Sequence, residues 1–177
     1  SNRINMPSIA EDILQQGQAD LVSLARAFLA DPDFVVKAAT GRTDEINTCI
    51  GCNQACLDHI FTDRIASCLV NPQACHETEF TAPAPQKTLK VAVVGAGPAG
   101  LACAITAAER GHQVHLFEAS GEVGGQLNLA RRIPGKEQEF AELVRYFKKR
   151  LSTTGVNVHL KQRVDASTLA SEGFERV

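Results

Sequence analysis

The sequence predicts an α/β protein with parallel strands, and two observations carry that prediction. Residues 90–94 form a short apolar strand that runs into a glycine-rich turn, an alanine-rich helix and a second apolar stretch. Residues 1–47 show a similar alternation, with helical patterns at 7–16 and 31–39 and an apolar stretch at 20–24 between them. Strands that alternate with helices at this spacing are typical of parallel sheets.

The composition is that of an ordinary globular protein, and it argues against several function classes. The 177 residues are 44% hydrophobic and 21% charged, with a net charge of −2. This balance gives no electrostatic reason to expect a nucleic acid or an anionic membrane as a partner. No apolar run approaches the roughly 20 residues that span a bilayer. The first residues also lack the basic start and apolar core of a secretion signal, so we expect a cytoplasmic protein.

Four segments can be distinguished along the chain. Residues 1–47 hold the first helix–strand–helix pattern, and residues 48–77 carry most of the cysteines with little periodicity. Residues 78–88 contain two prolines among small or polar residues, which indicates a linker. Residues 89–177 continue, beyond the glycine-rich turn, with a predicted helix at 137–152 and a strand at 156–160.

The glycine-rich turn has the complete context of a dinucleotide-binding fingerprint. Gly95, Gly97 and Gly100 lie between strand and helix, and Glu118 closes the next strand 18 residues after Gly100. Gly95 permits the tight turn, Gly97 lets the backbone approach a pyrophosphate, and Gly100 allows close packing of helix on sheet. The start of the helix favours negative charge, and Glu118 would accept hydrogen bonds from a ribose that carries no 2′-phosphate. Residues 89–177 are therefore predicted to be a Rossmann-like domain.

Four of the six cysteines follow the spacing C-x2-C-x3-C-x11-C: Cys49, Cys52, Cys56 and Cys68. Structural zinc sites commonly use two separated pairs of ligands, whereas three close cysteines and one remote cysteine are found in many cubane iron–sulfur sites. The spacing favours an iron–sulfur cluster. A zinc site, buried structural thiols and a disulfide framework are the alternatives, the last being unusual in a reducing compartment. Cys75 is not expected to be a ligand, and Cys103 is interpreted as a small core residue.

Several stretches resemble one family. NTCIGCNQACLDHIF, SCLVNPQACHE, the proline-containing linker and VAVVGAGPAGLACA are similar to the junction region of the NADPH-dependent 2,4-dienoyl-CoA reductases. These enzymes belong, with trimethylamine dehydrogenase, to the NADH:flavin oxidoreductase/old yellow enzyme group. The resemblance covers essentially the whole chain. It implies that residues 1–47 are the C-terminal end of an FMN-binding TIM barrel, residues 48–77 an iron–sulfur segment, and residues 89–177 part of an FAD-binding domain with a parallel sheet.

The resemblance also implies a set of ligands. The pair Gly124-Gly125 is similar to the second glycine-rich loop of FAD-binding two-dinucleotide-domain flavoproteins, which favours FAD over NAD. The residues expected to hold a [4Fe–4S] cluster are Cys49, Cys52, Cys56 and Cys68. Those expected at the FMN phosphate are Arg3, Ala25 through its backbone, and Arg26. Those expected at FAD are Gly95, Ala96, Gly97, Ala99, Gly100, Glu118, Gly125, Gln126 and Val164.

The implied reaction passes electrons from NADPH to FAD, then to the cluster, to FMN and to an unsaturated acyl-CoA. No catalytic residue is expected in this chain, because the proton donor of the family lies in the rest of the barrel. We therefore expect a fragment that is not catalytically complete by itself and whose last residues begin another strand. An amine dehydrogenase or enoate reductase of the same group is an alternative, as is a non-catalytic dinucleotide-binding module.

Overall fold

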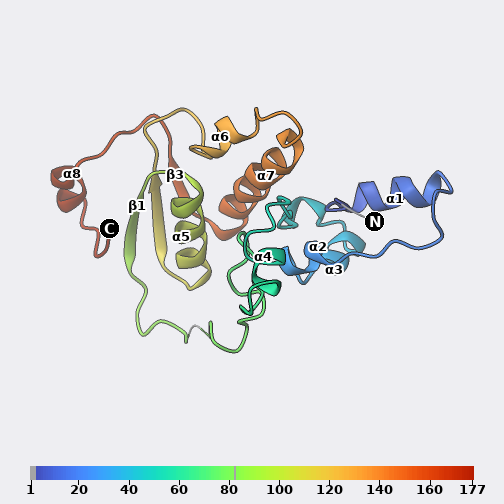
Figure 1. Cartoon of the computed structure of the whole chain (residues 1–177). Helices are drawn as coiled ribbons and strands as arrows, with labels where there is room; N and C mark the ends of the chain where they lie inside the picture. Colours follow the sequence, from blue (N-terminus) through green and yellow to red (C-terminus); the bar gives the residue numbers. More distant parts are fainter. Residues whose placement is uncertain (1–2, 82) are drawn as a thin grey trace. The chain divides into compact units, whose positions relative to one another are not determined.

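The computed structural model describes residues 3–81 and 83–177. The chain forms two compact units, Ser1–Thr81 and Ala82–Val177, and each is described by itself (Figure 1). The boundary between them falls inside residues 78–88, where the sequence predicts a linker.

The second unit is built on a parallel sheet of three strands in the order β1-β2-β3. The strands are β1 (Lys90–Val94), β2 (Gln113–Phe117) and β3 (Asn157–His159). Helix α5 (Pro98–Glu109) connects the first two strands, and helix α7 (Glu137–Thr154) precedes the third. The parallel α/β arrangement predicted from the sequence is confirmed, and so are the predicted strand at 90–94 and helix near 137–152.

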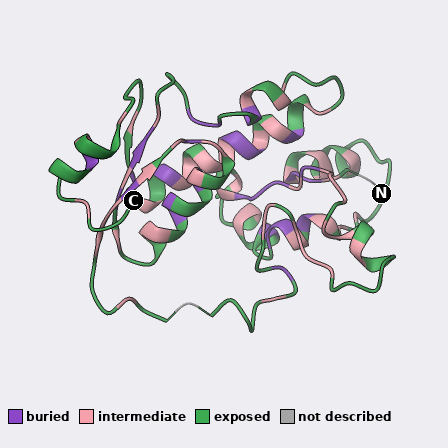
Figure 2. Ribbon diagram, turned by 60° about the vertical axis from the view of Figure 1, so that its left-hand side comes forward, coloured by how far each residue is buried: buried purple, intermediate pink, exposed green. Residues whose placement is uncertain are grey.

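Each strand presents alternate residues to the two faces of the sheet. The parallel register places Val91 opposite Val114 and Val93 opposite Leu116, and these residues contribute to one core. Helices α5 and α7 cover this face (Figure 1), and Figure 2 shows buried residues on the strands and on both helices. The buried members of this core are Ala96, Leu101, Ala104, Ile105, Val114, Leu116, Val123, Leu151 and Val156.

The opposite face of the sheet has a smaller core. Ala92 and Phe117 pack there with Leu169 of α8 (Ala166–Ser171). Asp165 caps the start of α8, and its carboxylate accepts the N–H of Thr168 at 2.8 Å. This hydrogen bond satisfies one of the donors that a helix leaves open at its start.

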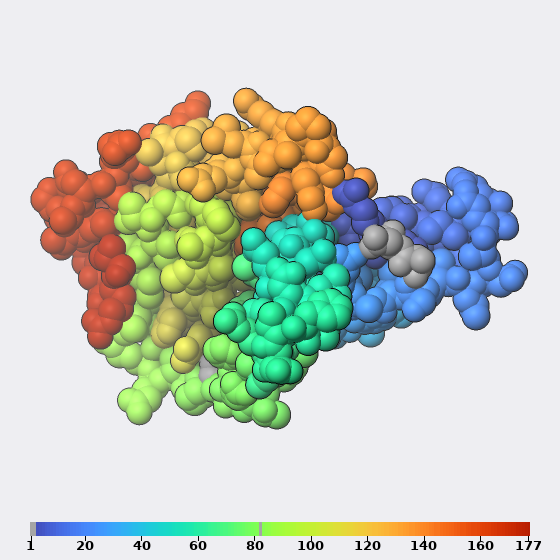
Figure 3. All heavy atoms as spheres, in the orientation of Figure 1, coloured from blue at the N-terminus to red at the C-terminus, as the bar shows by residue number. Residues whose placement is uncertain are grey.

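The C-terminal residues pair with the edge of the sheet. Val91 and Arg176 form a parallel bridge, and the N–H of Ala92 donates to the carbonyl of Arg176 at 2.9 Å. Figure 3 shows these residues, in red, running beside the green segment that contains β1. The C-terminal residues thus lie next to β1 at the edge of the sheet.

The first unit consists of short helices. These are α1 (Pro7–Gln15), α2 (Arg26–Ala30), α3 (Phe34–Ala39), a 3-10 helix η1 (Thr43–Glu45) and α4 (Leu57–Ile60). Helix α1 confirms the helical pattern at 7–16. A small core of Ala27, Phe34 and Ile46, joined by Leu24, lies among them. Among the described residues, no helix is both long enough and apolar enough to cross a bilayer.

Three details of the sequence interpretation are wrong. Residues 20–24 do not form a strand: the strands of the described chain are β1 to β3, and Leu21 is 87% exposed. A strand needs an adjacent strand whose backbone hydrogen-bonds with its own, and an apolar local sequence does not ensure that such a partner exists. Helix α3 begins at Phe34 and not at residue 31, because the Asp31 carboxylate accepts the N–H of Asp33 in a turn. Cys103 is exposed, because it lies away from the face of α5 that buries Leu101, Ala104 and Ile105.

The second unit also brings two histidines together that the sequence left without a role. Nδ1 of His115 and Nε2 of His159 are 3.0 Å apart, and their rings stack with Phe117 beside them. Burial lowers the pKa of His115, the nearby charges of His159 and Lys90 lower it further, and Glu172 opposes them. The positive form of His115 is therefore disfavoured in the folded unit.

We expect the second unit to lose stability as the pH falls below about 6.5. Because the folded-state pKa of His115 is lowered, the unfolded chain binds more protons between that pKa and 6.5. The stabilisation is complete above the unfolded value and is lost as the pH falls through the folded one. Urea denaturation at about pH 7.5 and about pH 5.5 measures the effect, and the loss should be smaller in His115→Phe. An equal loss in this variant would contradict the assignment.

Candidate functional site

The glycine-rich turn of the second unit is held to the end of β2 by a backbone hydrogen bond. Gly95 has φ +98° and donates its N–H to the carbonyl of Phe117 at 2.8 Å. Helix α5 then begins at Pro98, after Gly97 in an extended conformation. Proline has no N–H to leave unsatisfied, and the helix start presents the N–H groups of Ala99 and Gly100 without a side-chain cap. A helix start of this kind suits an anionic group such as a pyrophosphate.

Two of the glycines are required by close backbone contacts. A Cβ at Gly100 would lie 1.9 Å from the carbonyl oxygen of Gly95, so the helix could not pack on the turn with any side chain there. A Cβ at Gly125, where φ is +52°, would lie 2.9 Å from Cα of Gly97. The N–H of Gly124 donates to the carbonyl of Ala96 at 2.7 Å. The two glycine-rich loops therefore form one continuous backbone surface.

Glu118 is tied to this surface by both carboxylate oxygens. One oxygen accepts the N–H of Ala96 and the other the N–H of Ser120, each at 2.8 Å. The hydrogen bonds from Ser120 and Ala96 lower the pKa of Glu118, against a smaller opposing effect of burial. The carboxylate is therefore held ionised at the end of β2, beside the turn.

The remaining residues expected at FAD lie in two loops. Gln126 is exposed and directly precedes α6 (Leu127–Ala130). The loop after β3 runs beside Glu118, whose carbonyl accepts the N–H of Gln162 at 2.9 Å. Val164, in the same loop, is half-buried and packs against the core of the second face. Arg131, directly after α6, pairs with Glu122 at 3.3 Å.

The first unit holds the second candidate site. Cys49, Cys52, Cys56 and Cys68 are all half-buried and line one cavity. Cys75 is exposed and does not line it. In the part of the chain that the structure describes, no group of three or more His, Cys, Asp or Glu side chains is placed to hold a metal ion directly. The four cysteines therefore share one cavity without converging on the position of a single ion.

A buried carboxylate anchors the start of the cysteine loop. Asp31 is 2% exposed and accepts the N–H of Asn47 at 2.8 Å and the N–H of Asp33 at 3.0 Å. Lys37 donates to the same carboxylate at 2.7 Å. A buried charge is tolerated when it is paired and hydrogen-bonded, as Asp31 is. The carboxylate therefore fixes the backbone two residues before Cys49.

Asparagine side chains hold the rest of the loop, each by donating to a backbone carbonyl. Asn5 donates to Cys49 at 3.0 Å, Asn47 to Val70 at 2.8 Å, and Asn71 to Leu29 at 2.9 Å. The N–H of Ser67 also donates to the carbonyl of Ala55 at 2.6 Å. These bonds bring Cys68 to the other three cysteines, although it is remote in the sequence. The roles of Asp31 and these asparagines could not be found from the sequence, because their partners lie up to 44 residues away.

The surroundings of Cys68 disfavour a thiolate when nothing balances its charge. Burial raises the pKa of Cys68, the backbone N–H groups of Val70 and Asn71 lower it, and the charges of Cys49 and Cys52 raise it again. A bound cationic group would reverse this balance, because metals bind the deprotonated thiol.

The residues expected at the FMN phosphate lie in the first unit. Arg26 starts α2, lines the cysteine cavity, and donates from Nη1 to Oδ1 of Asn53 at 2.5 Å. Arg3 is exposed and has φ +60°. Ala25 is exposed, and its carbonyl accepts the N–H groups of Phe28 and Leu29. The contact between Arg26 and the cysteine loop was not foreseen from the sequence.

Each of the two units contains a segment that matches a known protein family or domain. Residues 1–45 match the model of the NADH:flavin oxidoreductase / NADH oxidase family, and residues 93–159 match an NAD(P)-binding Rossmann-like domain. The chain is 43% identical over 180 residues to a metal reductase of Desulforamulus reducens, covering 99% of this chain and 27% of that protein.

Two solved structures are also similar. A 2-naphthoyl-CoA reductase in complex with 2-naphthoyl-CoA has a TM-score of 0.92 and 35% identity, covering 98% of this chain and 26% of that one. Histamine dehydrogenase from Rhizobium sp. 4-9 has a TM-score of 0.83 and 32% identity, covering 97% of this chain and 27% of that one. The chain thus joins a segment that matches the NADH:flavin oxidoreductase family model to one that matches a Rossmann-like domain, and it spans 26% to 27% of the length of these longer proteins.

We expect Asp31→Ala to open the first unit locally. The substitution leaves the Asn47 N–H and the Lys37 ammonium without their buried partner, which costs roughly 3 kcal/mol. Hydrogen exchange of peptides covering residues 27–50 measures the free energy of local opening. Asp33→Ala, at an exposed position of the same turn, is the matched control and should change it by no more than about 0.5 kcal/mol. Equal protection in the two variants would show that Asp31 does not anchor the loop.

Proposed function

We propose that this chain is part of an oxidoreductase of the NADH:flavin oxidoreductase group that uses FMN, a [4Fe–4S] cluster, FAD and NADPH. When bound, the flavins supply hydride and single-electron chemistry, and the cluster supplies transfer of one electron at a time. The residues of this chain bind and orient these groups. The activity belongs to the longer protein, and no residue of this chain is proposed as catalytic.

The observation that carries the proposal is the cavity shared by the four cysteines. Zinc is bound at about 2.3 Å from each cysteine sulfur, so its four thiols crowd around a single ion. Here the four thiols line one cavity, but no three of the described His, Cys, Asp and Glu side chains converge on the position of a single ion. A cluster with several irons and sulfides suits four thiols spread around a cavity, and it would be held by Cys49, Cys52, Cys56 and Cys68.

The flavin sites are supported by the placement of their candidate ligands. The joined glycine loops present backbone N–H groups to a pyrophosphate, and the ionised Glu118 lies beside them for a ribose. We propose FAD for this site, with Gly125, Gln126 and Val164 contributing from the neighbouring loops. We propose Arg3, Arg26 and the Ala25 backbone for the FMN phosphate, since guanidinium groups match phosphate geometry.

For the substrate we propose a conjugated acyl-CoA thioester, as in the 2,4-dienoyl-CoA reductases. The high structural similarity to a naphthoyl-CoA reductase supports a CoA thioester. The second candidate is an amine, supported by the similarity to histamine dehydrogenase. Anaerobic assays of the full-length protein, with dienoyl-CoA and NADPH or with an amine and an electron acceptor, separate the two.

We expect the anaerobically purified chain to contain iron and acid-labile sulfide in equal amounts, about four of each. Cys68→Ser should abolish both and the visible absorption of the cluster, because it removes one of the four ligands. Cys75→Ser changes an exposed cysteine that does not line the cavity, and it should leave the cluster intact. Stoichiometric zinc without sulfide in the parent chain would overturn the cluster.

We expect Gly97→Ala to weaken FAD binding without unfolding the second unit. A Cβ at Gly97 meets no described atom within 4 Å, but it points into the space where we place the pyrophosphate. Binding should weaken by roughly tenfold or more, about 1.4 kcal/mol. Flavin fluorescence titration measures the affinity, with Ala102→Ser at an exposed position of α5 as control. Recovery of NAD and no FAD from the purified chain would contradict the assignment of FAD.

A further inference from the structure

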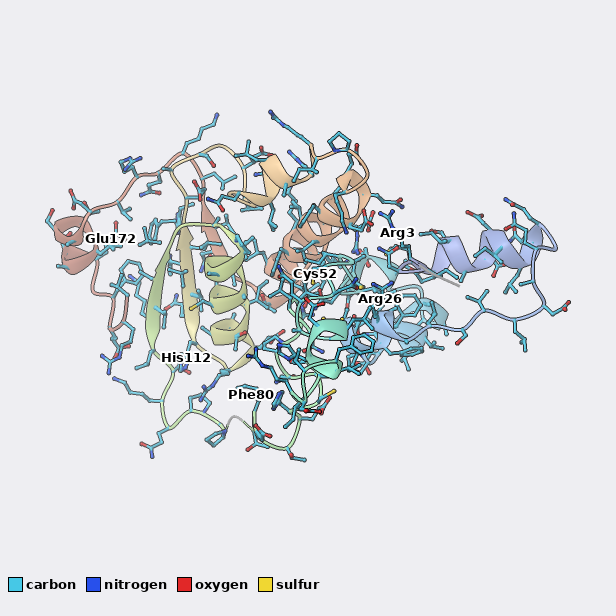
Figure 4. All side chains as sticks on the ribbon, viewed as in Figure 1. Arg3, Arg26, Cys52, Phe80, His112 and Glu172 are labelled. Atoms are coloured by element: carbon cyan, nitrogen blue, oxygen red, sulfur yellow. The ribbon has the colours of Figure 1, made fainter. Side chains whose placement is uncertain are left out.

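The second unit has an open hollow with a volume of about 350 Å³. No residue assigned above to FAD, FMN or the cluster lines this hollow. Figure 4 labels Arg26 and Cys52, which belong to the first unit. The volume is at the lower end of the range of roughly 300–1,000 Å³ found for small-molecule sites. The hollow is lined by residues 121–123, by Lys148, Leu151 and Ser152 of α7, and by Val156, Val158 and Leu160 in and beside β3.

The floor and one wall of the hollow are aliphatic. Val123, Leu151 and Val156 are buried members of the main core of this unit, so the floor is firmly packed from behind. Val158 and Leu160 are 36% and 42% exposed. They lie on the same side of the chain as Val156, because side chains alternate along a strand. In the described chain β3 is an edge strand, so no further strand covers this wall, and an alkyl chain laid on it would remove apolar surface from water.

Two polar groups at the hollow are available to a ligand. Lys148 and Ser152 both line it, and they lie on one side of α7 because they are four residues apart. Within the described chain, neither the Lys148 ammonium nor the Ser152 hydroxyl takes part in a hydrogen bond or an ion pair. An ammonium and a hydroxyl one helical turn apart can both donate to the same carboxylate.

The charge at the hollow also favours an anion. Lys148 has the only cationic side chain among the described residues that line it. The acidic residue at the hollow, Glu122, pairs with Arg131 at 3.3 Å, which offsets its charge. An uncharged apolar molecule would leave the Lys148 and Ser152 donors unused. The ligand class that matches the donors and the aliphatic wall together is an acid with an alkyl body.

We propose that this hollow binds an aliphatic carboxylate, with its carboxylate at Lys148 and Ser152 and its alkyl chain over Leu151, Val158 and Leu160. The donors orient the ligand, and burial of the alkyl chain supplies most of the favourable free energy. Because the hollow is open, we expect a dissociation constant of about 0.1–1 mM. The proposal uses no residue of the flavin or cluster sites and does not depend on the function proposed above.

The test is a titration of the isotope-labelled chain with decanoate at about pH 7.5, where the acid is ionised and lysine is charged, followed by amide chemical shifts. The shifts should saturate and should concentrate on residues 121–123 and 148–160. Lys148→Gln should weaken binding by about fivefold and Ser152→Ala by about twofold, as expected for exposed polar contacts. Both positions are exposed, so both variants should fold, and their amide spectra check this. Lys149→Gln is the matched control, because it removes the same charge from the next residue of α7, which does not line the hollow.

A second amphiphile separates a specific site from adsorption to any apolar surface. Decyltrimethylammonium has the same alkyl chain with a positive head, and it should bind at least fivefold more weakly than decanoate. Equal binding of the two, an equal loss in Lys148→Gln and Lys149→Gln, or shifts that do not saturate would overturn the proposal. Shifts of the same amides with protein concentration, in the absence of decanoate, would show that a second copy of the chain covers the hollow and would also overturn it.

Discussion

The cysteine site of the first unit depends on the burial of one carboxylate. Asp31 is removed from water and must be compensated, and its partners are the backbone of Asn47 and Asp33 and the ammonium of Lys37. The same contacts set where α3 begins and where the chain enters the cysteine loop. Asn47 then continues the chain of contacts through its side chain, which donates to Val70 near Cys68. The buried carboxylate of Asp31 thus links the start of α3 to Asn47, and Asn47 in turn links the segment before Cys49 to the segment after Cys68.

In the second unit, the loops of the candidate site are held together by close backbone contacts that only glycine permits. Gly100 touches the carbonyl of Gly95, and Gly125 touches the backbone of Gly97. These contacts bring two loops and a helix start within reach of a single ligand. Glu118 adds the negative charge of the site, and the N–H groups of Ser120 and of Ala96 in the turn lower its pKa and keep it ionised. In both units, backbone contacts fix the loops, and these loops then determine where the cysteine thiols and the Glu118 carboxylate lie.

The parts of this structure that could be predicted from the sequence are those with a local cause. Strand β1, helix α7 and the glycine turn follow from hydrophobic periodicity and from glycine at fixed spacing. The stretch at 20–24 is also apolar, but an apolar stretch forms a strand only when another strand pairs with it, and residues 20–24 have no such partner in the described chain. The roles of Asp31 and the asparagines, and the His115–His159 contact, depend on partners far away in the sequence. The four cysteines that spacing grouped line one cavity, but spacing could not show that Arg26 lines the same cavity.

The side chains that bond to the cysteine loop also determine how much charge lies near the thiols. Asn5, Asn47 and Asn71 fix the loop by donating neutral amide hydrogens to carbonyls, so they add no charge near the thiols. Asp31 is charged, but Lys37 pairs with it, and neither residue lines the cavity. The remaining wall is aliphatic apart from Asn53 and the thiols themselves. Among the described residues that line the cavity, Arg26 has the only cationic side chain, and it also donates to Asn53 of the loop, so a change at Arg26 alters both the charge of the wall and a bond that holds the loop.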